Sequence, residues 1–267
     1  MKHMVNRYFK VWLAFFRNTL SRDMEYKMNF ILEIFIDMIY YGSLFFFFKV
    51  IFQFTDSLGV FNQDATIIFL ITLYIADSLY QFFLGGNVFE VNNKVRTGDL
   101  DFILLKPINS QFFISFRYVS IHSLICVCVL SCLLIKLTYQ YHNESFNIIN
   151  YLFYNCSLII GMSIFYSFEF LIACLSFWLR NFSYAGWLAS ELIKYARRPD
   201  SIYNKWFRKT LFSVFPMAMI CSVPSRMIIF GVDYRLLLLQ LFVALFFLWL
   251  TTIIWKKGLL RYESASS

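Results

Sequence analysis

Charged residues are scarce in this chain of 267 residues. They make up 15% of it, whereas 60% of the residues are hydrophobic. So few charged side chains cannot cover the surface of one or two soluble domains. The composition therefore excludes a soluble protein and indicates that lipid is the solvent for most of the chain.

Residues that bind metals or act in catalysis are also few. The three histidines, His3, His122 and His142, are scattered over the chain, and none has a second ligand at metal-binding spacing. All six cysteines lie in the apolar segments described next, where a thiol behaves as a small apolar side chain. We therefore expect no catalytic residue, no metal site and no cofactor bound by this chain.

Six apolar segments are long enough to cross a bilayer. A helical crossing takes about 20 residues, because each residue advances about 1.5 Å through a hydrocarbon layer about 30 Å thick. Spanning strands would need alternating apolar and polar residues, which these segments lack. The predicted fold is a single all-α integral membrane domain with spans at residues 28–54, 65–86, 117–137, 148–179, 211–230 and 236–255.

Basic residues are divided unequally between the connections. Most of the 24 Lys and Arg residues lie in the N-terminal segment, in residues 87–117, in residues 180–209 and in the C-terminal tail. Basic connections stay in the cytoplasm, so this bias predicts that both termini are cytoplasmic in a multi-pass protein of a bacterial cell membrane. The net charge of +8 thus serves orientation, and we expect no nucleic-acid partner.

Two further segments are amphipathic. Residues 1–22 place basic and aromatic side chains on opposite faces, which predicts an interfacial helix on the cytoplasmic leaflet; the alternative is a frayed tail. Residues 183–197 are read as a second cytoplasmic amphipathic helix. A seventh span there would export Arg197, Arg198 and the basic residues that follow, and would place Glu191 and Lys194 in lipid.

The connection at residues 87–110 contains a short isolated helix. Gly98 breaks the helix before it, Asp99 can cap it and Pro107 stops it. The enclosed segment, Leu100 to Leu105, is too short to span the membrane but strongly apolar. Its side chains must therefore be buried against another surface at the membrane edge.

The fifth span contains Pro216 and Pro224, which are predicted helix breaks. Proline in a membrane helix frees a backbone carbonyl that neighbouring helices or water must satisfy. We expect the break near Pro224, with a re-entrant outer end as one outcome.

Four acidic residues lie inside predicted spans. A charge at membrane depth costs at least roughly 2.5 to 3.5 kcal/mol on insertion scales, so such residues usually face the bundle interior or a wet cavity. They are candidates for a substrate pathway, and they would suit a cationic or amphiphilic cargo. The alternative is that they anchor the bundle, for example through Lys27 or Arg117. The four residues are Glu33, Asp37, Asp77 and Glu169.

Three motifs, in order, resemble the membrane subunits of ATP-binding-cassette (ABC) transporters of the type-2, exporter-like permease family. The first reads GDLDFILLKP at residues 98–107. The second reads RPDSIY at 198–203, followed by Phe-Pro at 215–216 and Val-Pro at 223–224. The third reads WKKGLLRY at 255–262. The likeness covers nearly the whole chain.

The resemblance implies a permease that pairs with a second copy or a sister permease and with two cytoplasmic ATPase subunits, which bind ATP and Mg²⁺, to export a substrate. It further implies that the helix after the second span docks on the ATPase. The sequence agrees that the chain cannot hydrolyse ATP alone, because it lacks a phosphate-binding loop. The implied coupling residues are Arg96, Gly98, Asp99, Leu100, Asp101, Phe102, Leu105, Lys106 and Pro107.

Two other classes of protein compete with this interpretation. A self-sufficient secondary transporter or channel would show inverted repeats with interrupted helices in both halves, but the prolines interrupt a span only in the second half. A membrane-embedded enzyme would need clustered ligands or a nucleophile with its base, which the scattered histidines do not offer.

Overall fold

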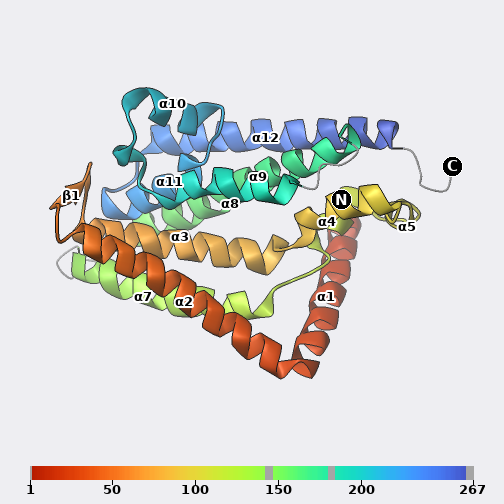
Figure 1. The fold of residues 1–267 in the computed structure, drawn as a ribbon, viewed down its shortest axis with the longest axis horizontal. Coiled ribbons are helices and arrows are strands. Elements are labelled where there is room, and N and C mark those ends of the chain that lie inside the picture. The colour runs from red at the N-terminus through yellow and green to blue at the C-terminus, as the bar shows by residue number, and fades with distance from the viewer. Residues whose placement is uncertain (1, 142–146, 180–183, 263–267) are drawn as a thin grey trace.

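The computed structural model describes residues 2–141, 147–179 and 184–262. These residues form an almost wholly helical bundle, which confirms the predicted all-α membrane fold (Figure 1). Within the described residues, five helices are long and apolar enough to cross a membrane. They are α2 (Lys27–Ile51), α3 (Gln63–Leu84), α7 (Ile121–Tyr141), α8 (Ile148–Cys174) and α12 (Tyr234–Arg261).

The bundle has two distinct ends (Figure 1). At the hairpin end, the antiparallel strands β1 (Ser57–Leu58) and β2 (Phe61–Asn62) join α2 to α3. At the other end, which we call the α4 end, α3 is joined to α7 through three short helices. Because α3 has 22 residues and a helix rises about 1.5 Å per residue, the ends are about one bilayer core apart. The short helices are α4 (Asn87–Thr97), α5 (Asp101–Leu104) and α6 (Ser110–Phe116).

The N-terminal residues form one helix, α1 (Lys2–Glu25), which lies along the α4 end and across the direction of the long helices (Figure 1). Its aromatic face packs on α6, with the Tyr8 and Phe112 rings 4.8 Å apart and the Phe15 and Phe113 rings 5.3 Å apart. Its described basic side chains, such as those of Lys10 and Arg17, are exposed. The helix is therefore built as an amphipathic element, and its place on a lipid leaflet stays a prediction.

The core is centred on α3, which packs against α7, α8 and the later helix α11 (Ala218–Ile229). Phe69 and Leu70 in α3 and Ile164 in α8 are fully buried there. In contrast, α2 packs loosely: Phe48 is buried, but large apolar side chains such as Phe35 and Phe46 are exposed. Lipid or another protein must cover these side chains.

The third crossing starts later than predicted. Residues 117–120 are not helical, and α7 begins at Ile121. The Asn87 side chain holds this turn: its Nδ2 donates to the Tyr118 carbonyl at 2.7 Å, and its Oδ1 accepts from the Tyr118 amide at 2.8 Å. Arg117 therefore lies in the α6–α7 turn and not in a span.

The chain crosses the bundle after α8, where the sequence predicted that it would not. Helix α9 (Ala185–Ile193) contacts α4, and the helical turn η2 (Lys194–Arg197) contacts α11. Beyond them, in η3 (Asp200–Ile202), the Ser201 hydroxyl donates to the Leu58 carbonyl at 2.9 Å, at the hairpin end. The prediction that residues 180–209 stay on one side is therefore wrong. The predicted helix at 183–197 is present as α9 and η2, but it runs between the two ends and does not stay at one of them; its first residue, Ser183, lies outside the described residues.

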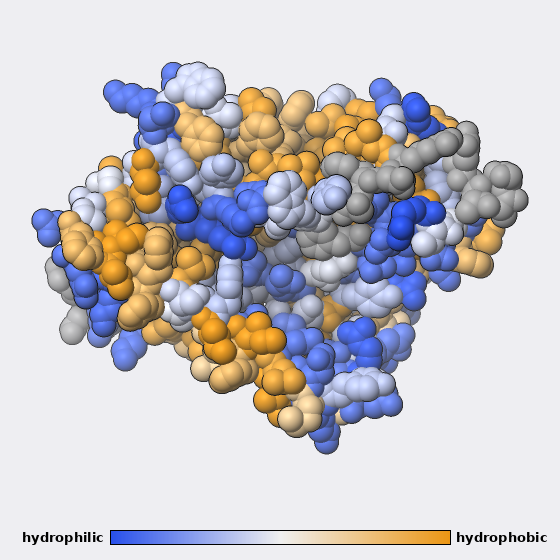
Figure 2. Space-filling view, in the orientation of Figure 1, coloured by the Kyte–Doolittle hydropathy of each residue, from blue (hydrophilic) through white to orange (hydrophobic). Residues whose placement is uncertain are grey.

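A counter-charge explains why the charge argument failed in this segment. Arg197 lies beside a cleft that it shares with Asp77, so the bundle interior offers its guanidinium an opposite charge. A basic residue that meets an acid inside the protein does not need to remain in the cytoplasm. The face seen in Figure 2 accordingly carries hydrophilic side chains across its middle, between apolar areas above and below.

The predicted fifth span is a re-entrant pair. Helices α10 (Lys205–Ser213) and α11 meet at an angle of 100°. Asp200 links the first turn of α10 to the last turn of α11. Its carboxylate lies 2.6 Å from Arg208 of α10 and 2.9 Å from Arg226 of α11. Helix α10 thus begins, and α11 ends, at the hairpin end, and the bend at Phe215 and Pro216 lies deeper in the bundle.

The bend lies at Pro216 and not near Pro224, which is inside α11. Pro224 cannot donate to the Ile220 carbonyl, four residues earlier. Gly161 of α8 packs directly on that carbonyl: a Cβ atom at Gly161 would lie 2.9 Å from the Ile220 oxygen. The Gln240 amide also donates to the neighbouring Met219 carbonyl at 2.8 Å. Neighbouring helices thus cover the disturbed turn and bond the carbonyl next to it, and α11 continues through its proline.

The described chain therefore passes between the two ends six times, through α2, α3, α7, α8, the interrupted segment 184–200 and α12. Both α1 and the last turn of α12 lie at the α4 end, where Trp255 Nε1 donates to Ser110 Oγ at 3.3 Å. One of these six segments differs from the predicted spans, and the cytoplasmic placement of the two ends of the chain stays a prediction.

Candidate functional site

The predicted coupling segment forms a ledge at the α4 end. Helix α4 ends at Gly98, whose φ of +84° is left-handed, and the chain then turns into α5. Leu100 and Ile103 are buried in a cluster with Phe113, while Phe102 and Leu105 are 69% and 83% exposed. The ledge, by which we mean Arg96 and residues 98–107, is thus packed on the bundle through Leu100 and Ile103. Its outer side exposes apolar side chains.

The start of α5 differs from the sequence-based prediction. Leu100 occupies the N-cap position and no side chain caps the helix there. The Asp99 carboxylate instead accepts a hydrogen bond from the Thr97 hydroxyl at 2.7 Å. Asp99 therefore closes the end of α4 and does not cap α5, because the turn at Gly98 directs its side chain back toward Thr97.

The remaining coupling candidates surround the ledge. Lys106 Nζ lies 5.4 Å from the centre of the Phe113 ring, and the Pro107 carbonyl accepts a hydrogen bond from Arg7 of α1. Arg96 lines a cleft of about 760 Å³ beside the last turn of α12. Burial, followed by the carboxylates of Asp101 and Asp99, raises the pKa of Tyr262 in the same cleft to about 12. The predicted residues thus form one continuous surface, with Leu100 inside it.

Two of the four intramembrane acids share a histidine. His122 Nδ1 lies 2.9 Å from Glu33 Oε2, and its Nε2 lies 3.6 Å from Asp37 Oδ2. This cluster ties α2 to α7. Lys27 and Arg117, which the sequence offered as partners, do not form these contacts. Sequence spacing could have suggested His122, because it begins its span at the same end of the bundle as the two acids.

Glu169 belongs to the core. It is 4% exposed in α8 and accepts a hydrogen bond from the Tyr80 hydroxyl of α3. The Tyr80 ring stacks on Phe165 with the ring centroids 3.9 Å apart. These contacts make Glu169 a link between the two most buried helices and keep its carboxylate away from any open surface.

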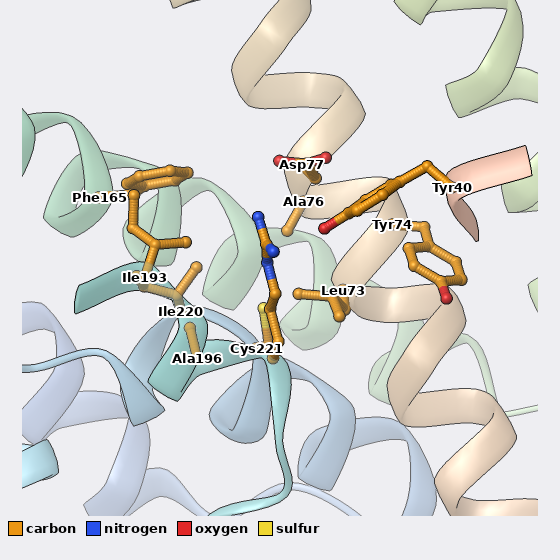
Figure 3. A pocket seen from close by; sticks show the side chains of 11 residues that line it. Tyr40, Leu73, Tyr74, Ala76, Asp77, Phe165, Ile193, Ala196, Ile220 and Cys221 are labelled. Carbon is orange, nitrogen blue, oxygen red and sulfur yellow. The ribbon is translucent and has the colours of Figure 1, made fainter. Parts of the chain in front are cut away.

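Two of the four acids line clefts: Glu33 lines one together with Arg22, Asp23 and His122, and Asp77 lines another. The cleft at Asp77 lies between α3, η2 and α11 (Figure 3). The Tyr40 and Tyr74 rings and apolar side chains such as Ile193 and Ile220 also line this cleft. The Tyr41 hydroxyl donates to Asp77 Oδ2 at 3.5 Å, so the carboxylate has a partner on α2 as well.

Arg197 supplies the positive charge of this cleft. Its guanidinium carbon lies 5.4 Å from the centre of the Tyr40 ring, and its charge acts on Asp77. No ion pair within 4 Å joins Arg197 to an acid among the described residues. Sequence reasoning missed Arg197 because it placed the residue in a cytoplasmic helix. A counter-charge inside a span, at Asp77, was the signal that could have identified it.

The structure thus separates the four acids into three environments: the His122 cluster for Glu33 and Asp37, the core for Glu169, and the cleft with Arg197 for Asp77. The idea that four acids bind a cationic cargo is therefore weakened, because Glu33, Asp37 and Glu169 already have partners in the bundle. Among the described residues, no group of three or more His, Cys, Asp or Glu side chains could hold a metal ion.

Comparison with known proteins identifies the family. Residues 38–266 match the family model described as ABC-2 family transporter protein. No curated protein and no solved structure matches the chain. The matched region begins within α2 and includes both the ledge at the α4 end and the Asp77–Arg197 cleft. The chain therefore belongs to the ABC-2 family of transporter proteins, as the membrane permease component of an ABC transporter.

Proposed function

We propose that this protein is the permease subunit of an ABC exporter, which moves a substrate across a bacterial cell membrane while separate cytoplasmic ATPase subunits bind ATP and Mg²⁺ and hydrolyse the ATP. In this proposal the α4 end faces the cytoplasm. The ledge formed by Arg96 and residues 98–107 is the surface that receives the ATPase.

The exposure of α5 is the observation that carries the proposal. A helix that faces water normally has polar side chains on its outer face. In α5, however, Phe102 and Leu105 point away from the bundle, while Leu100 is fully buried. A rigidly anchored element that presents apolar side chains is suited to a groove on a partner protein. Family membership supports an ATPase as that partner.

Contacts around the ledge offer a route for movement into the spans. Arg7 and Tyr8 of α1 bond the backbone at Pro107 and Asn109, and α1 leads directly into α2. On the other side, Ile103 packs in one cluster with Phe170 of α8 and Trp255 of α12. A displacement of α5 would therefore act on three spanning helices.

A second permease copy or a sister permease is the proposed partner within the membrane. The loosely packed α2 and the polar middle of the face in Figure 2 support this pairing. Arg197 and Asp77 are costly to expose to hydrocarbon, so a second subunit or water must cover them. A pathway between two such faces would place the Asp77–Arg197 cleft beside the substrate.

Co-purification with the cytoplasmic ATPase tests the proposal. Phe102→Asp and Leu105→Asp should each weaken association at least about tenfold, because each would place a carboxylate in an apolar interface. Phe54→Asp is the matched control, since Phe54 is 85% exposed at the hairpin end. Leu100 is unsuitable for this test because a charge at a fully buried position would disturb folding.

If both ledge variants keep the ATPase as the wild type does, the assignment of the ledge is wrong. Transport by vesicles that contain the permease without any ATPase would instead favour the alternative, a self-sufficient secondary transporter or channel.

A further inference from the structure

Two arginines line one cleft at the α4 end, which we call the arginine cleft. Arg96 comes from α4 and Arg261 from the last turn of α12, and the Phe177 and Tyr262 rings line the same cleft. Among the described residues, neither guanidinium makes an ion pair or a cation–π contact. Two positive charges that face one cleft repel each other, so an anion bound there would stabilise both.

The arginines of two other clefts already have partners in the chain. Arg22 lines the cleft beside Glu33 and lies 3.2 Å from the Asp23 carboxylate. The Arg197 guanidinium lies against the Tyr40 ring. The arginine cleft differs from both, because its two positive charges remain available to a ligand.

Two acids lie close to the arginine cleft, but neither lines it. Asp99 accepts a hydrogen bond from the Thr97 hydroxyl, and Asp101 interacts with Tyr262. Both carboxylates are thus engaged on the side of the ledge. They do not supply the counter-charge that Arg96 and Arg261 lack.

The position of the arginine cleft along α12 matches the depth of lipid headgroups. The apolar run of α12 ends at Trp255, and Arg261 follows six residues later, which is about 9 Å at 1.5 Å per residue. An arginine side chain at this distance reaches the headgroup layer beside the hydrocarbon. Large apolar side chains next to the lining residues are also exposed, with Leu260 at 89% and Trp178 at 37%, as expected where lipid covers them.

The space inside the arginine cleft suits a small charged group. Its mouth is open to solvent, and the volume within it that a ligand can fill is about 300 Å³. This is at the lower end of the range of small-molecule sites. A phosphate with a short polar substituent therefore fits, and a bulky molecule does not.

We propose that the arginine cleft binds the phosphate group of an anionic lipid, with Arg96 and Arg261 contacting the phosphate from two different helices. A guanidinium can donate two parallel hydrogen bonds to phosphate oxygens. Basic pockets between membrane helices are suited to anionic headgroups. A soluble phosphate ester offers the same chemistry, but it would leave Leu260 and Trp178 uncovered. The inference concerns binding by this chain and does not depend on the proposed function.

A bound phosphate would link α4 to α12. Arg96 belongs to the ledge, whereas Arg261 ends the last crossing helix. The lipid would thus hold the base of the ledge against α12.

Calorimetric titration of the purified permease tests the inference. The protein is held in dodecyl maltoside micelles, which contain no phosphate. Three probes are compared: dioctanoylphosphatidylglycerol, dioctanoylglycerol and glycerol 3-phosphate. The second probe keeps the two acyl chains without a phosphate, and the third keeps a phosphate without the chains.

The wild type should bind dioctanoylphosphatidylglycerol at least about tenfold more tightly than dioctanoylglycerol. Arg261→Gln and Arg96→Gln should each lose about tenfold in affinity for the phospholipid. Both arginines are exposed, so these variants should fold. Lys257→Gln is the matched control, because Lys257 is an exposed basic residue near the end of the same helix that does not line the cleft. Its affinity should change less than twofold.

The glycerol 3-phosphate titration identifies the source of the phosphate. Weaker binding than that of the phospholipid supports a lipid, and equal binding that still depends on Arg261 supports a soluble phosphate ester in the same site. Unchanged affinity for the phospholipid in Arg261→Gln would overturn the inference. An equal loss in Lys257→Gln would overturn it too, since it would show a general attraction of anions to this end of the bundle.

Association with the ATPase is measured on the same preparations. If Arg261→Gln loses the ATPase and keeps its affinity for the phospholipid, the cleft binds an acidic segment of the ATPase, and the inference is wrong while the proposed function stands. If the wild type binds the phospholipid as expected but no ATPase, the proposed function fails alone.

Discussion

The two ends of the bundle are held together by different kinds of contact. At the hairpin end, a carboxylate with no exposed surface, that of Asp200, contacts two arginines. At the α4 end, aromatic side chains such as Phe113 and Trp255 pack around α5, and exposed apolar side chains remain beside them. The hairpin end is thus held by buried ion pairs. The α4 end is held by apolar packing and still has apolar side chains that nothing in this chain covers.

This difference indicates which end can move. A buried ion pair is strongly destabilised when either partner is withdrawn, so the Asp200 cluster fixes the α10–α11 pair in one position. Burial of apolar surface is non-directional, and a small displacement of one helix against another at the α4 end leaves no buried charge unpaired. The α4 end is therefore suited to receive a partner, while the hairpin end holds the crossing segments in place.

Loss of the Asp200 charge should have the largest effect. Asp200→Asn would leave Arg208 and Arg226 without a counter-charge, and Arg226 is the less exposed of the two. We expect the free energy of unfolding to fall by about 3 kcal/mol, measured by denaturation in mixed micelles. Asp64→Asn, at an exposed position of the same end, should change it by less than about 0.5 kcal/mol.

The double variant Asp200→Asn/Arg208→Gln separates charge from packing. Removal of one arginine should recover part of the lost stability, because fewer unpaired charges remain. If the double variant is as unstable as the sum of the two single variants, the cluster does not act through charge.

Composition and hydropathy were sufficient for the helical membrane fold, because a span is a property of about 20 consecutive residues. They failed for residues 184–200, where two short helical segments cross together and neither is long enough alone. The charge bias reinforced this error, since Arg197 counts as a cytoplasmic residue until Asp77 is known to face it. Long-range pairing of this kind is not visible in a local sequence pattern.

The candidate sites were predictable to different degrees. Motif order located the ledge at residues 98–107, and the structure shows which of its side chains are exposed. The acids were identified by their cost in lipid, but their partners His122 and Tyr80 come from other helices. The break at Pro216 also depended on tertiary contacts, because Gly161 and Gln240 allow α11 to continue through Pro224.

Two glycines offer a smaller test of rigidity in the two regions. An added methyl group at Gly161 would lie 2.9 Å from the backbone oxygen of Ile220, whereas at Gly258 it would meet the Phe177 ring, with the nearest atom at 2.3 Å. Backbone cannot move without shifting α11, but an aromatic ring can rotate away. Gly161→Ala should therefore cost about 2 kcal/mol, and Gly258→Ala should cost less despite the closer contact.

Unfolding measurements on the two alanine variants decide between these cases. A greater loss in Gly258→Ala would show that the α4 end is the more rigidly packed region, which would reverse the comparison between the two ends.

Tyr262 should give the smallest effect, and it tests whether the α4 end depends on charge at all. Burial and the nearby Asp101 and Asp99 raise its pKa to about 12, above the value near 10 of an unfolded tyrosine. The unfolded chain therefore loses this proton first, so the stabilisation is complete below pH 10 and is lost as the pH rises toward 12. Between these values the wild type should lose about 2 °C more in unfolding midpoint than Tyr262→Phe. Equal slopes in the two proteins would mean that the acids of the ledge do not act on Tyr262, and that aromatic packing alone closes this end of the bundle.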